Sequence, residues 1–487
     1  MSRVRRMGRP ALALALVVAL LAGACSGDGG GGGDDAADDG ADRSQPNVVV
    51  VITDDQTVAM MEALGRTREL VGAEGTTFTR ATVSMPLCCP ARATLLTGQL
   101  PHTTGVRDNL APDGGFTRLD WSRTVATELQ AAGYRTAHVG RTLNDYTVDA
   151  RPLVPPGWDE WYTPLEDNTR SFIASGATVV ANGEIVSLSP LVHTDDALGE
   201  VALGLIDEWV DGDAPFYLEL GSVAPHTARP KVGEPGPLPV PADRHVDGAL
   251  GARRPELVPD EPGKPDWVTA GDPVDPGALD RYWARALESL QAVDEAIASI
   301  VGRLDRAGAL DDTVVLVTSD NGIALGEHGL GLDKVTPYEP SVRIPLLVRG
   351  PGFPAGESDL PVSHVDVAPT ILTAAGLDVP AWMEGVPIQE ALADPGTAAR
   401  RVQVVESPPS ARPAPPFLQI RSGDLVLTRY ETGEAELTDL GVDPDQARNL
   451  VDDPAYGDDL VALDAAAAVL RSCSGDRCVV YDEEARP

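Results

Sequence analysis

The feature that most constrains the fold is the run Asn47–Thr53, in which every residue after Asn47 is β-branched. An unbroken apolar run of strand length is typical of a strand covered on both faces. Further apolar runs of this length follow helix-like segments along the chain. The expected helix and strand pairs are 124–132 with 135–139, 195–209 with 216–220, and 279–307 with 313–318. This alternation predicts a layered α/β domain with a mostly parallel central sheet.

The pattern changes after about residue 380. Short strand-like runs alternate with turn glycines, and a helix-like segment follows them. The runs are 418–420, 425–430 and 435–440, the glycines are Gly423 and Gly433, and the helix spans 460–470. We therefore expect a catalytic α/β domain over residues 46–379. A smaller C-terminal α+β subdomain with a short antiparallel sheet is expected over residues 380–487.

The N-terminal residues have the layout of an export signal. Arginines between residues 3 and 9 precede an apolar run, 11–24, that is too short to span a bilayer. The run ends in Leu-Ala-Gly-Ala-Cys25, which resembles a bacterial lipobox, so residues 1–25 are predicted to be a lipoprotein signal peptide with Cys25 lipidated. A soluble secreted protein is the alternative. Residues 26–45, rich in Gly and Asp, are predicted to be a disordered linker.

These features predict an exported protein on the outer face of the bacterial cytoplasmic membrane, with the lipid as its only membrane contact. The formal net charge of −36 argues against nucleic acid as a partner. It does not exclude an anionic small substrate, because the local field in a pocket can oppose the global one. In an oxidising compartment, Cys473 and Cys478 would close a small disulfide loop.

Polar side chains follow two of the predicted buried strands. Asp54 and Asp55 come directly after the first strand, and Asp320 and Asn321 follow the strand 313–318. Ligands collect beyond the carboxyl ends of strands in open α/β sheets. Three carboxylates and one amide oxygen suit Ca²⁺ or Mg²⁺. The alternative for each residue alone is a helix cap or a turn.

Two adjacent cysteines, Cys88 and Cys89, stand at the predicted start of a helix. Neighbouring Cα atoms lie about 3.8 Å apart, below the usual disulfide range that begins at about 4.4 Å, so a bridge between them would be strained. The alternative is an ordinary helix start with Pro90 at the first helical position and two buried thiols.

The run Cys88-Cys89-Pro90-Ala91-Arg92, with Leu96-Thr97-Gly98 after it, resembles the signature of the sulfatase family in the alkaline phosphatase superfamily. Further segments resemble the same family across the chain. They are 140–146, 224–226, 326–329 with Lys334, 345–352 and 435–440. The doubled cysteine and the segment 140–146 point to the branch of N-acetylglucosamine-6-sulfatases and heparan endosulfatases. The resemblance implies an alkaline-phosphatase-like α/β fold.

The resemblance also implies the chemistry of the site. Cys88 would be oxidised by a formylglycine-generating enzyme to formylglycine (3-oxoalanine), whose hydrate is the nucleophile. The metal, Ca²⁺ in most of the family with Mg²⁺ possible, would be held by residue 88 and by Asp54, Asp55, Asp320 and Asn321. Arg92 would orient the hydrate.

Substrate contacts follow from the same resemblance. Arg141, His226 and Lys334 would bind the sulfate, with His226 protonating the departing sugar oxygen at a pKa in the neutral range. His328 is a weaker candidate for substrate binding, and a structural histidine is its alternative.

The chain departs from the family pattern beside this site. Arg141 stands where the family usually has lysine, and a guanidinium can hold a sulfate oxygen but cannot donate a proton. Leu143 replaces a common histidine and Thr142 replaces an aromatic residue, so the base that expels sulfate is not identified.

The function expected from the resemblance is hydrolysis of sulfate esters, with a sulfated amino sugar or glycan as the substrate. The alternatives are a phosphodiesterase or phosphonate monoester hydrolase of the same superfamily, or a catalytically silent lipoprotein that binds glycans if Cys88 is not converted.

Overall fold

The structure is a computed structural model. It describes residues 45–150, 152–166, 175–228, 238–248, 254–270, 275–410 and 413–482. The expected signal peptide, Cys25 and all but the last residue of the expected linker lie outside the described residues. Among the helices of the described ranges, none combines the length and the apolar composition that a bilayer span requires.

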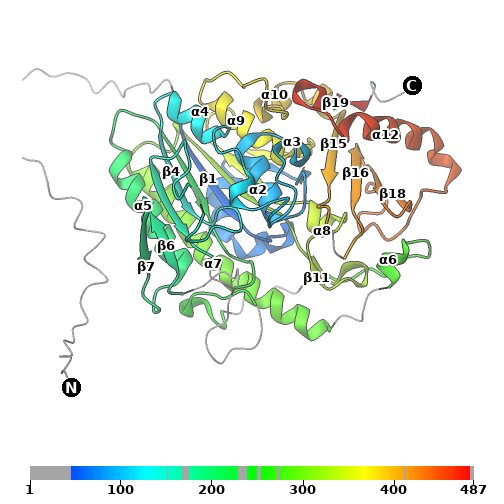
Figure 1. Cartoon of the computed structure of the whole chain (residues 1–487), viewed down its shortest axis with the longest axis horizontal. Helices are drawn as coiled ribbons and strands as arrows, with labels where there is room; N and C mark the ends of the chain where they lie inside the picture. The colour runs from blue at the N-terminus through cyan, green and yellow to red at the C-terminus, as the bar shows by residue number, and fades with distance from the viewer. Residues whose placement is uncertain are drawn as a thin grey trace, which may run out of the picture.

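A ten-stranded sheet forms the centre of the molecule, in the order β13-β2-β12-β9-β1-β8-β4-β5-β6-β7 (Figure 1). Strand β1 (Asn47–Thr53) lies between β8 (Phe216–Gly221) and β9 (Thr313–Ser319) and runs parallel to both. The other strands are β2 (Thr76–Phe78), β4 (Arg135–Gly140), β5 (Glu160–Pro164), β6 (Thr178–Ala181), β7 (Glu184–Ser187), β12 (Leu346–Arg349) and β13 (Gly356–Ser358). The predicted mostly parallel central sheet is confirmed.

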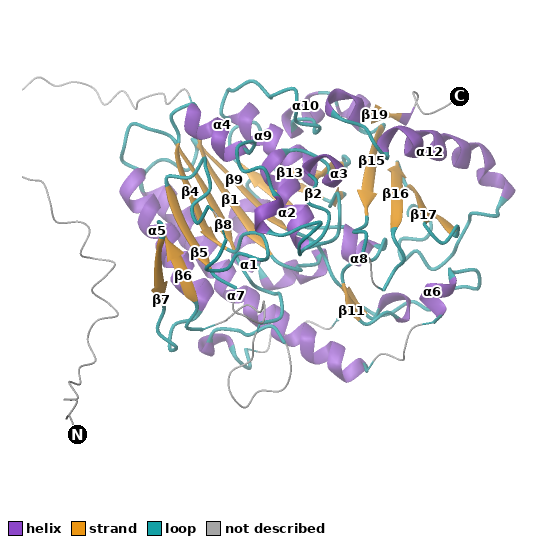
Figure 2. Cartoon of the chain, viewed as in Figure 1, coloured by secondary structure: helices purple, strands orange, loops and turns teal. Residues whose placement is uncertain are grey.

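Helices cover both faces of this sheet (Figure 2). Alternate residues of β1 face two different cores. Val48, Val50 and Ile52 pack on the side of α2 (Cys88–Thr97), α4 (Val125–Ala131) and α9 (Val367–Ala374), whereas Val49 and Val51 pack on the side of α5 (Thr194–Trp209) and α7 (Pro276–Arg306). Each buried Val or Ile contributes about 1.5–3 kcal/mol, which explains why residues 48–52 are all apolar.

Local signals fix the ends of these helices. The Thr124 side chain accepts a hydrogen bond from Thr127 N and caps α4. Helix α7 begins three residues before the expected start, because Asp275 caps it through Gly277 N at 3.0 Å and Pro276 suits the first helical position. Gly308, at φ +68°, ends the last turn of α7, since glycine adopts this conformation without steric cost.

A five-stranded antiparallel sheet forms the C-terminal region, in the order β18-β17-β16-β15-β19. Its strands are β15 (Arg401–Glu406), β16 (Phe417–Ser422), β17 (Leu425–Tyr430), β18 (Ala435–Asp439) and β19 (Val480–Tyr481). Helix α12 (Gly457–Leu470) shares an apolar core with this sheet. The predicted antiparallel sheet is confirmed, although the sequence did not predict β15 and β19.

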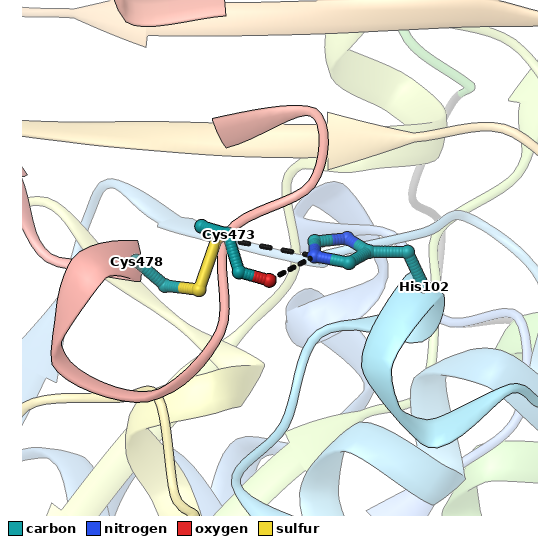
Figure 3. A group of neighbouring side chains, drawn as sticks. All are labelled: His102, Cys473 and Cys478. Atoms are coloured by element: carbon teal, nitrogen blue, oxygen red, sulfur yellow. Dashed lines mark hydrogen bonds between the residues drawn. A yellow bond between two sulfur atoms is a disulfide. The ribbon is translucent and has the colours of Figure 1, made fainter. Parts of the chain in front are cut away.

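A polar cluster joins the C-terminal loop to the α/β layers (Figure 3). A disulfide links Cys473 and Cys478. His102, on the short helix α3 (Pro101–Thr104), has its Nε2 at 3.0 Å from Cys473 O and its Nδ1 at 2.7 Å from Glu406 Oε1. Burial alone would lower the pKa of His102, but the hydrogen bond and charge of Glu406 outweigh it and raise this pKa to about 9.

This ion pair predicts a pH dependence of stability. The folded protein holds the His102 proton more tightly than the unfolded chain, so the stabilisation is complete below pH 6.5 and is lost as the pH rises to about 9. Allowing for solvent screening, we expect the free energy of unfolding to fall by about 1–2 kcal/mol over this range. Urea unfolding of the wild type and of His102→Gln at both pH values checks this. Equal losses in the two proteins would contradict it.

Candidate active site

The carboxylates predicted to bind a metal meet at one edge of the central sheet. Because β1 and β9 are parallel neighbours, Asp54 and Asp55 after β1 lie beside Asp320 and Asn321 after β9. All four residues are buried. Asp54, Asp55 and Asp320 each place a carboxylate oxygen within 4.8 Å of the others.

An unusual backbone conformation brings the second carboxylate to this edge. Asp55 has φ +68°, a left-handed conformation that is uncommon outside glycine and is over-represented at functional sites. Its backbone N–H donates to Asp320 Oδ1 at 3.2 Å, and the next residue, Gln56, donates its N–H to Ser319 Oγ at 3.0 Å. These bonds hold the two strand ends together.

The donor set fits a hard divalent cation. Asn321 Nδ2 donates to Asp55 Oδ1 at 2.5 Å, which orients the amide. Asn321 Oδ1 is buried and has no hydrogen-bond donor within the described part of the chain. An unsatisfied buried acceptor costs about 1–3 kcal/mol, and coordination to Ca²⁺ or Mg²⁺ would remove that cost.

Cys88 is the first residue of α2 and lies against this cluster. Its Sγ is 2.8 Å from Lys334 Nζ and 3.8 Å from Asp54 Oδ1. The sequence suggested Pro90 as the first helical residue. In the structure α2 begins at Cys88, so Pro90 is the third. Proline is tolerated there because N–H groups of the first turn have no partner within the helix. Burial raises the pKa of Cys88 to about 12, so the thiol stays protonated at neutral pH and is a poor nucleophile.

Cys89 points away from the carboxylates. Its Sγ accepts from Asn144 N at 2.9 Å, and its own N–H donates to Asn109 Oδ1 at 2.9 Å. Both cysteines are free thiols. The sequence alone does not single out Asn109, and it marks Asn144 only within the segment 140–146. Neither loop position carries a signal of its own, because the contacts join residues 20 and 55 positions apart.

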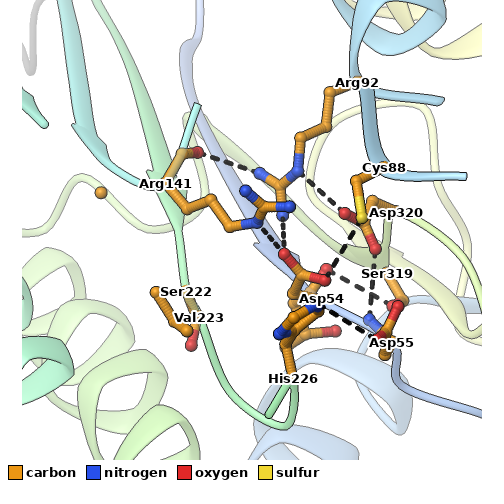
Figure 4. Close-up of polar contacts among 12 residues, drawn as sticks. Asp54, Asp55, Cys88, Arg92, Arg141, Ser222, Val223, His226, Ser319 and Asp320 are labelled. Carbon is orange, nitrogen blue, oxygen red and sulfur yellow. Dashed lines mark hydrogen bonds and ion pairs between the residues drawn. The ribbon is translucent and has the colours of Figure 1, made fainter. Parts of the chain in front are cut away.

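Two arginines compensate the buried carboxylates, and both reach toward Asp54 (Figure 4). Arg92 Nε donates to Asp320 Oδ2 at 2.8 Å, and its Nη2 lies 3.4 Å from Asp54 Oδ2. Arg141 Nε donates to the same Asp54 oxygen. Gly140, just before Arg141, lies so close to β8 that a Cβ atom there would be 1.9 Å from Gly221 O.

Lys334 is the third cation of the site. Its Nζ lies 2.7 Å from Asp55 Oδ1 and beside the Cys88 thiol. Burial lowers the pKa of Lys334, but the charge and hydrogen bond of Asp55, with the charge of Asp320, outweigh burial and raise it. The ammonium therefore remains charged and available to an anionic substrate.

His226 differs from its sequence-based expectation. Its Nδ1 lies 2.6 Å from Thr227 O and its Nε2 lies 3.7 Å from Asp55 Oδ2. Burial, with the charges of Lys334 and Arg141, lowers the pKa of His226 well below 6.5. The expected neutral-range pKa is therefore wrong for this structure. The imidazole is neutral, its Nδ1–H donates to Thr227 O, and the Nε2 lone pair faces the site.

His328 contacts other residues of the fold, Asp260 and Tyr338. Its Nδ1 lies 2.6 Å from Asp260 Oδ1, and its ring stacks on Tyr338 with a centroid separation of 3.7 Å. These contacts favour the structural alternative over substrate binding.

The fit to a cation predicts a stability shift. Adding Ca²⁺ or Mg²⁺ to chelator-treated protein, at about 100 times the dissociation constant, should stabilise it by about 2.7 kcal/mol. Asp55→Asn should abolish most of this response. Asp294→Asn is the matched control, because Asp294 is also buried but binds Thr67 outside the site. Thermal unfolding measures the shift, and an equal response of all three proteins would rule out this site.

Comparisons with known proteins agree along most of the chain. Residues 46–377 match the family model Sulfatase, and residues 326–470 match the model N-sulphoglucosamine sulphohydrolase, C-terminal. An arylsulfatase of Volvox carteri is 34% identical over 369 residues, covering 68% of this chain and 56% of the relative. The N-acetylglucosamine-6-sulfatase of Homo sapiens is 33% identical over 358 residues, covering 69% and 62%.

A third relative, the extracellular sulfatase SULF-1 homolog of Drosophila melanogaster, is 30% identical over 376 residues, covering 73% of this chain and 32% of the relative. The chain thus spans less than two thirds of the length of each of these curated relatives.

Solved structures share the fold. The structure of BT4656 in complex with its substrate D-glucosamine-2-N,6-O-disulfate has a TM-score of 0.73 and 22% identity, covering 86% of this chain and 96% of that one. The phosphonate monoester hydrolase SpPMH from Silicibacter pomeroyi has a TM-score of 0.63 and 20% identity, covering 88% and 95%. The predicted alkaline-phosphatase-like fold is confirmed.

Proposed function

Because the chain belongs to the sulfatase family, in the branch of the N-acetylglucosamine-6-sulfatases, we propose that it hydrolyses sulfate esters of a sulfated amino sugar or glycan. The observation that carries this proposal is the position of Cys88. It begins a buried helix between the Lys334 ammonium and the carboxylate of Asp54. The substrate class is supported by the relative that acts, by its name, on N-acetylglucosamine 6-sulfate groups, and by the glucosamine disulfate in the structurally similar complex.

Two groups beyond the encoded side chains complete the proposed site. Cys88 oxidised to formylglycine by a formylglycine-generating enzyme supplies, as its hydrate, the oxygen nucleophile for sulfur, and a divalent cation supplies positive charge against a sulfate oxygen. The cation, Ca²⁺ or Mg²⁺, would be held by residue 88 and by Asp54, Asp55, Asp320 and Asn321. The position of Cys88, a free thiol beside the carboxylate of Asp54, supports this conversion.

Basic residues bind and orient the sulfate in this proposal. Lys334 and Arg141 donate to sulfate oxygens, and the positive N-terminal end of the α2 dipole adds to the potential. Arg92 acts as a positioning residue. The hydrogen bonds found for its guanidinium go to Asp54, Asp320 and the backbone of Arg141, so it fixes the carboxylates around residue 88.

His226 protonates the departing sugar oxygen. In the structure its imidazole is neutral, but a bound sulfate ester would bring negative charge beside Nε2 and raise the pKa of His226. The hydrogen bond from Nδ1–H to Thr227 O holds the ring with Nε2 toward the substrate.

Export and anchoring also belong to this proposal. The apolar run 11–24 and the name of the extracellular relative support a protein carried across the membrane. The lipobox-like residues before Cys25 support a lipid on Cys25 that holds the protein there. Labelling with a radioactive fatty acid tests the anchor, and the label should be absent from Cys25→Ser.

Two measurements test the proposed activity. A substrate panel compares an aryl sulfate and N-acetylglucosamine 6-sulfate with aryl phosphate and phosphonate esters. Faster turnover of the phosphorus esters would overturn the choice of sulfate. Mass spectrometry of the peptide Leu87–Arg92 tests the conversion, in which oxygen replaces sulfur and two hydrogens are lost. Sulfur retained at residue 88 would favour the silent glycan-binding lipoprotein.

A further inference from the structure

A cavity of about 210 Å³ lies between the two sheets, away from the carboxylate cluster. Its lining comes from the segment around β3 (Ala81–Thr82), from α8 (Glu339–Val342) and from strands β15 and β16. Figure 1 shows α8 between the central sheet and the C-terminal sheet. None of its lining residues belongs to the proposed active site.

Four arginines line this cavity, which is unusual in a chain whose net charge is −36. They are Arg80, Arg343, Arg401 and Arg421. Arg80 pairs with Asp424 at 3.0 Å and Arg421 pairs with Glu339 at 2.6 Å.

The remaining two arginines leave an excess of positive charge in the lining. Arg401 Nη1 pairs with Asp366, which lies outside the lining, at 2.7 Å. Arg343 has no carboxylate within ion-pair distance among the residues that the structure describes. The four arginines of the lining thus outnumber its two carboxylates, Glu339 and Asp424.

Three buried donors of this lining have no acceptor in the described ranges. They are Arg343 Nε, Arg401 Nε and Gln403 Nε2. Arg401 and Gln403 are only 8% and 7% exposed, so bulk water does not satisfy these groups. A buried donor without a partner destabilises the folded state, and more strongly when it is charged. A set of such donors around an arginine-rich cavity is the arrangement that a bound oxyanion requires.

We propose that this cavity binds a sulfate or phosphate group, held by Arg343, Arg401 and Gln403. The oxygens of a tetrahedral oxyanion match the planar donor fork of a guanidinium. The volume is below the range of about 300–1,000 Å³ typical of larger ligands, so the cavity suits a free oxyanion or a single sulfated sugar unit. Because its donors come from both sides of the interface between the sheets, the anion would also stabilise their packing. This site does not depend on the conversion of Cys88.

Calorimetric titration with sodium sulfate tests the site. The full chain carries Lys334→Ala in every sample, which weakens oxyanion binding at the proposed active site. Sodium chloride at equal ionic strength is the reference. We expect saturable sulfate binding whose dissociation constant rises at least about tenfold in Arg343→Gln. This variant breaks no ion pair among the described residues, so it should fold.

Arg66→Gln is the matched control, since it removes the same charge from an arginine whose side chain is 54% exposed and lies outside the cavity. Its affinity for sulfate should equal that of the parent. Gln403→Glu is the second variant. It places a carboxylate among the arginines and should abolish binding while the thermal stability is kept. Equal affinity in Arg343→Gln and the parent, or no binding in the parent, would overturn the proposal.

Two further ligands distinguish the source of the oxyanion. Inorganic phosphate and N-acetylglucosamine 6-sulfate are titrated in the same way. Tighter binding of the sulfated sugar than of inorganic sulfate assigns the cavity to a carbohydrate sulfate group, and tighter binding of either inorganic ion assigns it to the free anion. These results stand whether or not the protein hydrolyses sulfate esters.

Discussion

Cys88→Ala is expected to lower kcat for sulfate ester hydrolysis by at least about 10⁴-fold, as removal of a catalytic nucleophile does in other hydrolases. No other group can take its place. The neighbouring thiol of Cys89 faces the Asn144 side chain and the backbone oxygen of Asn109 instead of the carboxylates. Rates with an aryl sulfate, measured with saturating Ca²⁺, give the size of the loss.

Cys89→Ser is the matched control for this experiment. It changes the adjacent thiol, keeps a hydrogen-bonding group between the two asparagines, and should retain activity within about tenfold. Circular dichroism and the melting temperature of each variant show whether it folds. Activity of Cys88→Ala above about 1% of the wild-type rate would remove this residue from the mechanism.

Arg92→Ala is expected to have the largest effect on stability. The Arg92 side chain is 3% exposed and pairs with Asp54 and Asp320, both fully buried. Removing one partner of a buried ion pair leaves uncompensated charge and costs about 3–5 kcal/mol. Urea unfolding in the presence of chelator measures the loss. Activity should fall as well, because these carboxylates would lose their orientation.

Three comparisons sharpen this test. Arg92→Lys keeps the charge but not the planar fork, so an intermediate loss is expected. Combining Arg92→Ala with Asp320→Ala should recover part of the stability, because the unpaired carboxylate is removed. Arg118→Ala is the control, since its guanidinium is exposed and bonds only the backbone of Gly105 among the described residues. A loss below about 1 kcal/mol in Arg92→Ala would refute the proposed role of this charge pair.

The sequence predicted well those elements that depend on local pattern. Strands β1 and β17 have the expected bounds, because uninterrupted or turn-bounded β-branched and apolar runs are strong local signals. Strand β15 was missed. Gln403 lines the arginine-lined cavity, and Glu406 binds His102. These polar residues interrupt the apolar pattern of the strand, and their partners are distant in the sequence.

The same distinction applies to the site. The strand-end carboxylates could be placed together from the sequence, because parallel neighbouring strands end at one edge. The lowered pKa of His226 could not be predicted, since it results from burial and from two cations brought in by distant segments. The stacking of His328 on Tyr338 is likewise a product of tertiary packing.

The burial of α2 has a consequence for maturation. All ten residues of this helix are buried, and Cys88 is 1% exposed. An enzyme that oxidises the thiol must bind the peptide on both sides of it. In the folded protein these residues are buried and cannot be bound. The proposed oxidation must therefore take place on the nascent or unfolded polypeptide. Molecules that fold before oxidation would keep the Cys88 thiol. The specific activity of a preparation would therefore depend on the rate of oxidation relative to the rate of folding.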